Sequence, residues 1–142
     1  MLVPNAPSPL SRSQRGRIGI ISGSGPDAGI DLWQKVLQAS RELQGPLYQG
    51  DLDAPHVEIT SPPGLGLSME LAANDIVVWP ALENSVRRLA GHVDIFAIAC
   101  NTLNYYHRQI DRLAVPARLV STPAVIRDHL HRNGVTRVAL LG

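Results

Sequence analysis

Short apolar runs alternate with amphipathic stretches along most of the chain. The apolar runs fall at residues 17–21, 57–60, 93–99, 118–120 and 137–141. Runs of this length, bounded by Gly, Pro or Ser, predict buried β-strands. The stretches between them carry apolar side chains at helical spacing, so strands and helices are predicted in alternation. This order is typical of an α/β fold with a parallel sheet of about four to five strands, flanked by helices on both faces.

Glycine and proline mark the ends of most predicted helices. Pro26 suits the first turn of one helix, which Gly45 ends. The next helix is expected to begin at Pro80 and to end at Gly91, after a stretch at 65–78 whose pattern fits a short helix, a loop or both. Two further helices are expected, one marked by Tyr106, Ile110 and Leu113 and one capped by Thr122 and ended by Gly134.

The two ends of the chain differ from this regular pattern. Three prolines among small polar residues predict a flexible leader over residues 1–16, ahead of one α/β domain over 17–142. The last predicted strand stops one residue before the end of the sequence, where a parallel strand normally leads into a loop and a helix. We expect the apolar edge near 138–141 to be exposed and to drive pairing into a homodimer.

The composition narrows the class of function. The 142 residues are 44% hydrophobic and 18% charged, with a formal net charge of +1, which are values of a globular domain. This charge gives no basic face for nucleic acid, and no run approaches the roughly 18 apolar residues of a membrane span. The single cysteine excludes an intramolecular disulfide and favours the reducing cytoplasm. Only His129 and His131 of the five histidines lie close together, and because i,i+2 side chains do not share a helix face, no metal site is expected.

The cysteine directly follows an apolar strand. Cys100 ends the run 95–99, and Asn101 and Thr102 come next. Open α/β sheets bind ligands at the carboxyl ends of their strands. A thiol followed there by an amide and a hydroxyl indicates a nucleophile or a proton-transfer group with its hydrogen-bonding partners. A second interpretation stays open, because free cysteine is often buried as a small hydrophobic residue.

A glycine-rich turn follows the first predicted strand. At the start of a helix, the backbone N–H groups of such a turn favour an anion. Its glycines match neither a dinucleotide fingerprint nor a phosphate-binding P-loop. If the first and third strands deliver their loops to one edge, the turn and the cysteine segment share a crevice. That crevice would hold Ser22, Gly23, Ser24, Cys100, Asn101 and Thr102, with Thr60 or Ser61 added from the second strand.

Three segments resemble the aspartate/glutamate racemase family. RIGIISGSGP at 17–26 is similar to the family's opening strand and GGMGP-like turn, and ACNT at 99–102 is similar to its cysteine-asparagine-threonine signature. TRVALLG at 136–142 resembles the strand that opens the family's second half. The three segments occur in the family's order, so the chain resembles the N-terminal, flavodoxin-like half of the Asp/Glu racemase fold.

The resemblance implies a cofactor-independent racemase acting on an amino acid or a related small carboxylate. In the family, two cysteines, one from each half, remove and return the Cα proton of a substrate held between the halves. Carried onto this chain, Cys100 is the acid/base of the first half, while Asn101 and Thr102 bind the carboxylate or the amino group. The turn residues Ser22, Gly23 and Ser24 line the same pocket, and Ser61 is a further candidate.

The chain departs from the family pattern at three points. Ser22 and Ser24 replace the first glycine and the methionine of the turn, and His107 lies later than the histidine that usually follows the threonine. A second cysteine is absent from the sequence, so we expect the chain alone to be incomplete or inactive as a racemase. Two alternatives stay open. One is another enzyme on this scaffold, of the hydantoin racemase, maleate isomerase or arylmalonate decarboxylase type; the other is a non-catalytic binding or structural domain.

Overall fold

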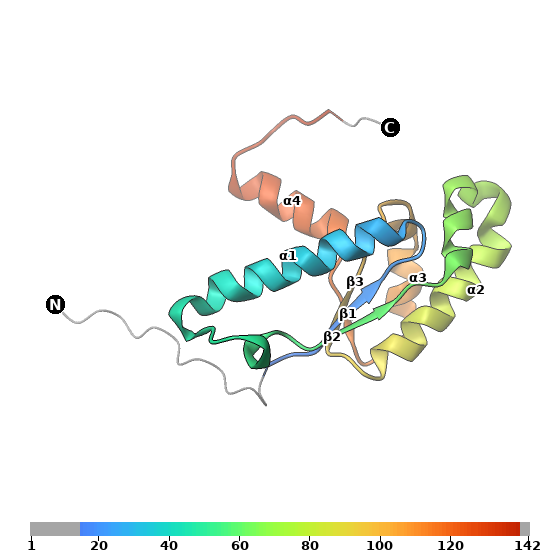
Figure 1. The fold of residues 1–142 in the computed structure, drawn as a ribbon. Helices are drawn as coiled ribbons and strands as arrows, with labels where there is room; N and C mark the ends of the chain where they lie inside the picture. The colour runs from blue at the N-terminus through green and yellow to red at the C-terminus, as the bar shows by residue number, and fades with distance from the viewer. Residues whose placement is uncertain (1–14, 140–142) are drawn as a thin grey trace.

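Four parallel strands form the centre of the protein (Figure 1). The computed structural model describes residues 15–139. The strands are β1 (Ile18–Ile21), β2 (Val57–Thr60), β3 (Ile95–Ile98) and β4 (Arg118–Leu119). They lie in the order β2-β1-β3-β4, and every neighbouring pair is parallel. The parallel α/β sheet expected from the sequence is therefore confirmed.

The strand order creates a switch point beside β1. Its first residue, Ile18, lies opposite Val57 of β2 on one side and Ile95 of β3 on the other. The connection after β1 leads to β2 on one side of the sheet, whereas the connection after β3 leads to β4 on the other side. In open α/β sheets such a reversal opens a crevice outside the carboxyl ends of the two strands, and ligands bind there.

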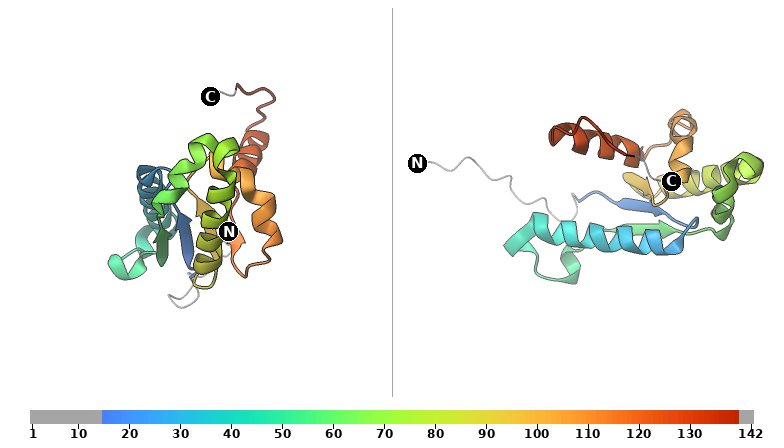
Figure 2. Two further views of the ribbon diagram at one scale, coloured as in Figure 1. Left: turned by 90° about the vertical axis from the view of Figure 1, so that its right-hand side faces the viewer. Right: turned by 90° about the horizontal axis from the view of Figure 1, so that it is seen from above.

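Helices cover both faces of the sheet, as the sequence predicts (Figures 1 and 2). Helix α1 lies against one face, and α2 and α3 lie against the other. The helices are α1 (Pro26–Gln44), α2 (Leu71–Ala90), α3 (His107–Arg112) and α4 (Thr122–Arg132). Short 3-10 turns join them: η2 (Gly45–Leu47), η3 (Asp51–Asp53), η4 (Pro63–Glu70) and η5 (Thr102–Tyr106).

The hydrophobic core lies between the sheet and α2. One face of α2 and the inward side chains of β1 and β3 pack together with η5 and α3. A side chain at Gly19 would place its Cβ 2.7 Å from Cδ2 of Leu89, so α2 packs directly on the backbone of β1. The buried side chains of this cluster include Ile21, Val78, Leu82, Val86, Leu89, Phe96, Ile98, Leu103, Tyr106 and Ile110.

Helix α2 begins earlier than the sequence predicts. We expected its start at Pro80, but the helix begins at Leu71 and Pro80 lies inside it. A proline inside a helix removes one N–H donor and crowds the preceding turn. Val78 and Leu82, one on each side of the proline, are fully buried in the core. Burial of both turns therefore keeps the helix continuous, and the ambiguous stretch 65–78 becomes η4 and the first part of α2.

The predicted fifth strand does not form in the part of the chain that the structure describes. Residues 137–139 have no strand pairing, and residues 140 and 141 lie outside the described range, as do residues 1–14 of the predicted leader. Val138 is 68% exposed. An apolar run becomes a strand only where neighbouring backbone supplies its hydrogen bonds. The sheet within residues 15–139 therefore has four strands.

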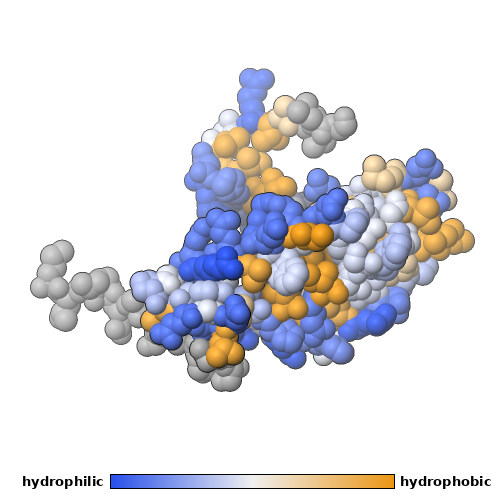
Figure 3. Space-filling view, viewed as in Figure 1, coloured by the Kyte–Doolittle hydropathy of each residue, from blue (hydrophilic) through white to orange (hydrophobic). Residues whose placement is uncertain are grey.

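Helix α4 is amphipathic and packs loosely. Its N-cap is Ser121 and not Thr122 as expected, because the Ala124 N–H donates to Ser121 Oγ at 3.4 Å. None of the α4 side chains is buried, and apolar atoms gather over the helix in Figure 3. Val125 and Ile126 are about half exposed. Among residues 15–139, no helix combines the length and apolar character needed to cross a membrane.

Candidate functional site

Backbone hydrogen bonds bring three loops together at the carboxyl edge of the sheet. The Ala99 N–H donates to Ile21 O at 2.9 Å, so the cysteine segment leaves β3 beside the end of β1. The Ser22 N–H donates to Thr60 O at 2.8 Å, so the glycine-rich turn also leaves β1 beside the end of β2. The three polar segments expected to share a crevice therefore begin at neighbouring positions of one sheet edge.

The glycine-rich turn packs tightly against the loop that follows β2. Gly23 has a φ of 115°, in a region that L side chains rarely adopt. A Cβ at this position would lie 2.3 Å from Pro62 O, which is closer than any real contact. A Cβ at Gly66 in η4 would lie 3.7 Å from Gly23 O, so η4 also lies next to the turn. Only glycine fits at position 23, between the loop at Pro62 and the turn η4.

The serines of the site differ in their environments. Ser22 is 2% exposed, and its hydroxyl donates to Gly25 O at 3.2 Å, within the turn itself. Ser22 thus holds the turn closed, and its hydroxyl proton is already engaged. Ser24 is half-buried and Ser61 is exposed. These two side chains are the parts of the predicted set on these two loops that stay accessible to a ligand, whereas Gly23 is buried between its neighbours.

The cysteine segment is fixed by hydrogen bonds on both sides of the thiol. Cys100 is half-buried, and its Sγ accepts the Leu103 N–H at 3.5 Å. Asn104 is 3% exposed, and its Nδ2 donates to Cys100 O at 2.6 Å. Asn101 is exposed and Thr102 is half-buried, so both predicted ligand-binding side chains remain partly accessible.

Asn104 is a residue that sequence reasoning missed. Its Oδ1 is buried and has no hydrogen-bond partner among the described residues, although buried polar atoms nearly always have one. The amide sits four residues after Cys100, and only the 3-10 turn of η5 brings it back against that residue's carbonyl. A strand-and-helix pattern does not reveal such a turn. The free Oδ1 is an acceptor beside the cysteine segment.

A second missed pair ties helix α2 to the cysteine loop. The fully buried Tyr106 donates its hydroxyl to Asp75 Oδ1 at 2.6 Å. Its ring also lies 5.3 Å from that of Trp79, between ring centres. Tyr106 ends η5, the turn that begins two residues after Cys100, so the first part of α2 braces the segment that carries the thiol.

Burial, reinforced by the hydrogen bond to Asp75, raises the pKa of Tyr106 above its ordinary value of 10.0. In the unfolded chain the phenol ionises near that ordinary value, whereas in the folded protein it stays protonated to higher pH. The contribution to stability is therefore complete below pH 10 and declines as the pH rises above it. We expect Tyr106→Phe to flatten this alkaline decline, measured by urea unfolding between about pH 8 and about pH 11. Identical alkaline slopes in the wild type and the variant would contradict this assignment.

A hollow of about 510 Å³ opens next to the cysteine segment. Its polar side chains are those of Asn101, Thr122, Arg127, His131 and Thr136, and the rest of the lining is apolar. The apolar lining comes from α4 and the segment after it, and includes Ile126, Leu130, Val135 and Val138. The exposed side chain after the cysteine therefore faces a space large enough for a small molecule. Within the described ranges, no group of three or more His, Cys, Asp or Glu side chains gathers in a way that could hold a metal ion.

The structure defines an open, all-parallel α/β protein with polar loops at the β1/β3 switch point. An aspartate racemase homologue from Pyrococcus horikoshii is similar to it, with 21% identity and a TM-score of 0.69 over 84% of this chain and 50% of that chain. An aspartate racemase from Picrophilus torridus is also similar, with 20% identity and a TM-score of 0.67 over 84% of this chain and 49% of that one. No protein-family model matches the sequence, and no curated protein sequence matches it significantly.

These similarities establish the fold. The chain spans about half the length of the two solved structures, and its α/β unit has the architecture of one half of an aspartate racemase homologue. The resemblance that the turn and the cysteine signature indicate is thereby confirmed at the level of the fold.

Proposed function

We propose that this chain is a racemase-like protein of the aspartate/glutamate type, in which Cys100 transfers the Cα proton of a small amino acid without a cofactor. One observation carries the proposal. The thiol, with a backbone donor on its sulfur, leaves β3 at the switch point directly beside the turn that leaves β1. The fold shared with aspartate racemase homologues supports the same chemistry.

The proposed step is a proton transfer to sulfur. The Cys100 thiolate takes the Cα proton, so the C–H bond breaks and an S–H bond forms. The electron pair of that bond moves into the substrate carboxylate as an enolate, which hydrogen-bond donors must stabilise. The side chains of Ser24, Asn101 and Thr102 supply such donors in this proposal, and Gly23 holds the turn that carries Ser24. Ser61 adds a further hydroxyl from the loop after β2.

Racemisation needs a second acid/base on the opposite face of Cα. We infer that a second copy of the chain supplies it in a homodimer, because residues 15–139 place one thiol at this edge of the sheet. The half-exposed Val125 and Ile126 of α4 give such a pair an apolar surface to bury. Two thiols acting together invert the configuration of the substrate, whereas one thiol alone exchanges the proton with retention. The enantiomeric composition of the recovered amino acid distinguishes the two cases. A protein that needs a reduced thiol also suits the cytoplasm.

The thiol itself provides the test of this proposal. We expect iodoacetamide to alkylate Cys100 at a rate that falls at least about fivefold when aspartate or glutamate saturates the site, because bound substrate shields the sulfur. Intact mass reads a single adduct, since the chain has one cysteine. Alkylation of the urea-unfolded chain in the same amino acids is the control, and its rate should not change.

Two outcomes would contradict the proposal. A thiol that stays unmodified in the folded protein would favour the non-catalytic interpretation, in which Cys100 serves the core cluster against which it packs. Equal rates of alkylation with and without each of D- and L-aspartate and D- and L-glutamate would exclude binding of these amino acids beside the thiol. A small carboxylate that protects where aspartate and glutamate do not would redirect the search to the other reactions known on this scaffold.

A further inference from the structure

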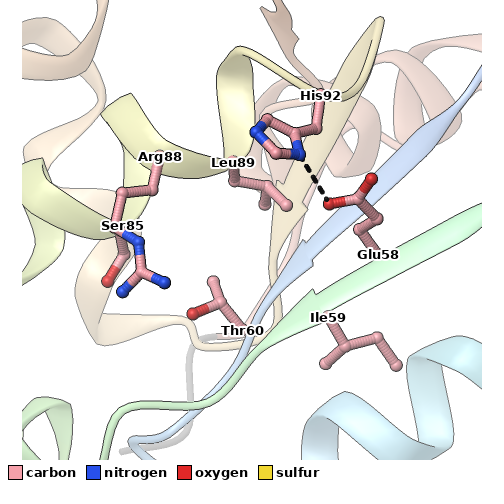
Figure 4. A pocket seen from close by; sticks show the side chains of 7 residues that line it. All are labelled: Glu58, Ile59, Thr60, Ser85, Arg88, Leu89 and His92. Carbon is pink, nitrogen blue, oxygen red and sulfur yellow. Dashed lines mark ion pairs between the residues drawn. The ribbon is translucent and has the colours of Figure 1, made fainter.

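A second hollow, of about 450 Å³, lies along β2, and none of residues 99–102 lines it (Figure 4). Its walls are the α2-facing side of β2 and the last turns of α2. The hollow therefore lies against the face of the sheet that α2 covers. The lining residues are Glu58, Ile59, Thr60, Ser85, Arg88, Leu89 and His92.

The hollow contains two opposite charges that do not pair with each other. Glu58 contacts two histidines, His92 at 3.5 Å and His56 at 3.2 Å. Arg88 makes no ion pair with any residue in the described part of the chain. In Figure 4 the guanidinium of Arg88 and the carboxylate of Glu58 lie on opposite sides of the open space. The neighbouring Arg87, by contrast, pairs with Glu83 at 2.8 Å along the helix.

Two hydroxyl side chains, Thr60 and Ser85, also line the hollow beside these charges. The Thr60 side chain is half-buried and, in Figure 4, lies on the same side of the hollow as the Arg88 guanidinium. Ser85 Oγ donates to Ala81 O at 2.8 Å, which leaves its oxygen only as an acceptor. Leu89 adds an apolar wall. A cationic donor group, a hydroxyl and an anionic acceptor thus face one space.

We propose that this hollow binds a zwitterionic amino acid, with its carboxylate on Arg88 and Thr60 and its ammonium group on Glu58. A guanidinium presents a planar fork that matches a carboxylate, and a carboxylate accepts strongly from an ammonium group. The formal charges of the two sides cancel, which suits a ligand that carries one charge of each sign. Thr60 is the one residue that the site shares with the set considered for the cysteine crevice. Arg88 and Glu58 lie outside that set, so they test this site separately from the proton-transfer proposal.

Amide chemical shifts in a titration with L-glutamate test this site. We expect shifts at residues 58–60 and 85–92, and an affinity that falls at least about tenfold in Arg88→Gln. Arg87→Gln is the matched control, since it removes the adjacent arginine, which pairs along the helix, and it should bind as the wild type does. Glutarate, which lacks the ammonium group, should bind more weakly than L-glutamate to the wild type, and Glu58→Gln should remove that preference.

The location of the shifts separates this site from the cysteine site. Shifts at residues 58–60 and 85–92 that persist in Cys100→Ala support a separate site, even if no shift occurs at 99–102. No shift at 58–60 and 85–92, or shifts there with unchanged affinity in Arg88→Gln, would overturn the proposal whatever happens near the thiol.

Discussion

Replacing Gly23 with alanine is expected to lower the free energy of unfolding by about 2–5 kcal/mol. Two effects add. The new side chain must adopt the φ of 115° that glycine adopts freely, and its Cβ would lie 2.3 Å from Pro62 O. The obstacle is backbone, so no side-chain rotation can relieve it. Urea unfolding of the variant, followed by circular dichroism, gives the change in the free energy of unfolding.

Gly25→Ala is the matched control for this prediction. Gly25 belongs to the same turn, but a Cβ there meets nothing within 4 Å and its backbone is extended. We therefore expect Gly25→Ala to change the stability by less than about 1 kcal/mol. If both variants lost the same stability, the cause would be a general sensitivity of the turn, and the close approach of the two loops would be wrong.

The sequence pattern predicts the sheet well because each strand is a short apolar run between clear breakers. Ile18–Ile21 and Ile95–Ile98 lie within the predicted runs, and Pro26 and Gly45 bound α1 as expected. Local signals suffice at these positions. Pro80 shows where they fail, because the local cost of a helical proline is outweighed by burial of the turns on both sides, and burial depends on the whole fold.

The run at 137–141 shows a second limit of the sequence pattern. Residues 138–141 are all apolar in the manner of a buried strand, yet residues 137–139 pair with nothing in the described part of the chain. Strand propensity expresses how well a side chain fits a pleated and covered surface. Without a neighbouring strand beside them, residues 137–139 form no strand and stay exposed.

The sequence likewise predicts one part of the candidate site and not the rest. The positions of the glycine-rich turn and the cysteine segment could be predicted, since parallel strands bring their carboxyl ends to one edge. The bracing pair of Asp75 and Tyr106 could not, because it depends on how α2 is rotated about its axis and on the turn of η5. The opposite charges of Glu58 and Arg88, which share a hollow without pairing with each other, were missed for the same reason, since they come from a strand and a helix that are distant in sequence.

Replacing Cys100 with alanine is expected to reduce Cα proton exchange in aspartate or glutamate at least about 100-fold, because a positioned acid/base typically accelerates proton transfer by that factor or more. The fold should survive. The side chain is small and half-buried, and the one side-chain hydrogen bond that is lost is the long 3.5 Å contact from the Leu103 N–H. Urea unfolding of Cys100→Ala checks that any loss of exchange is chemical and not a loss of structure.

The most direct test of the account is Cα proton–deuterium exchange in heavy water, followed by NMR on D- and L-aspartate and D- and L-glutamate. The account predicts exchange of at least one of these four substrates by the wild-type chain and its loss in Cys100→Ala, while Gly25→Ala retains it. Exchange at equal rates in the wild type and Cys100→Ala, or no exchange of any of the four substrates by the wild type, would contradict the assignment of Cys100 as the base.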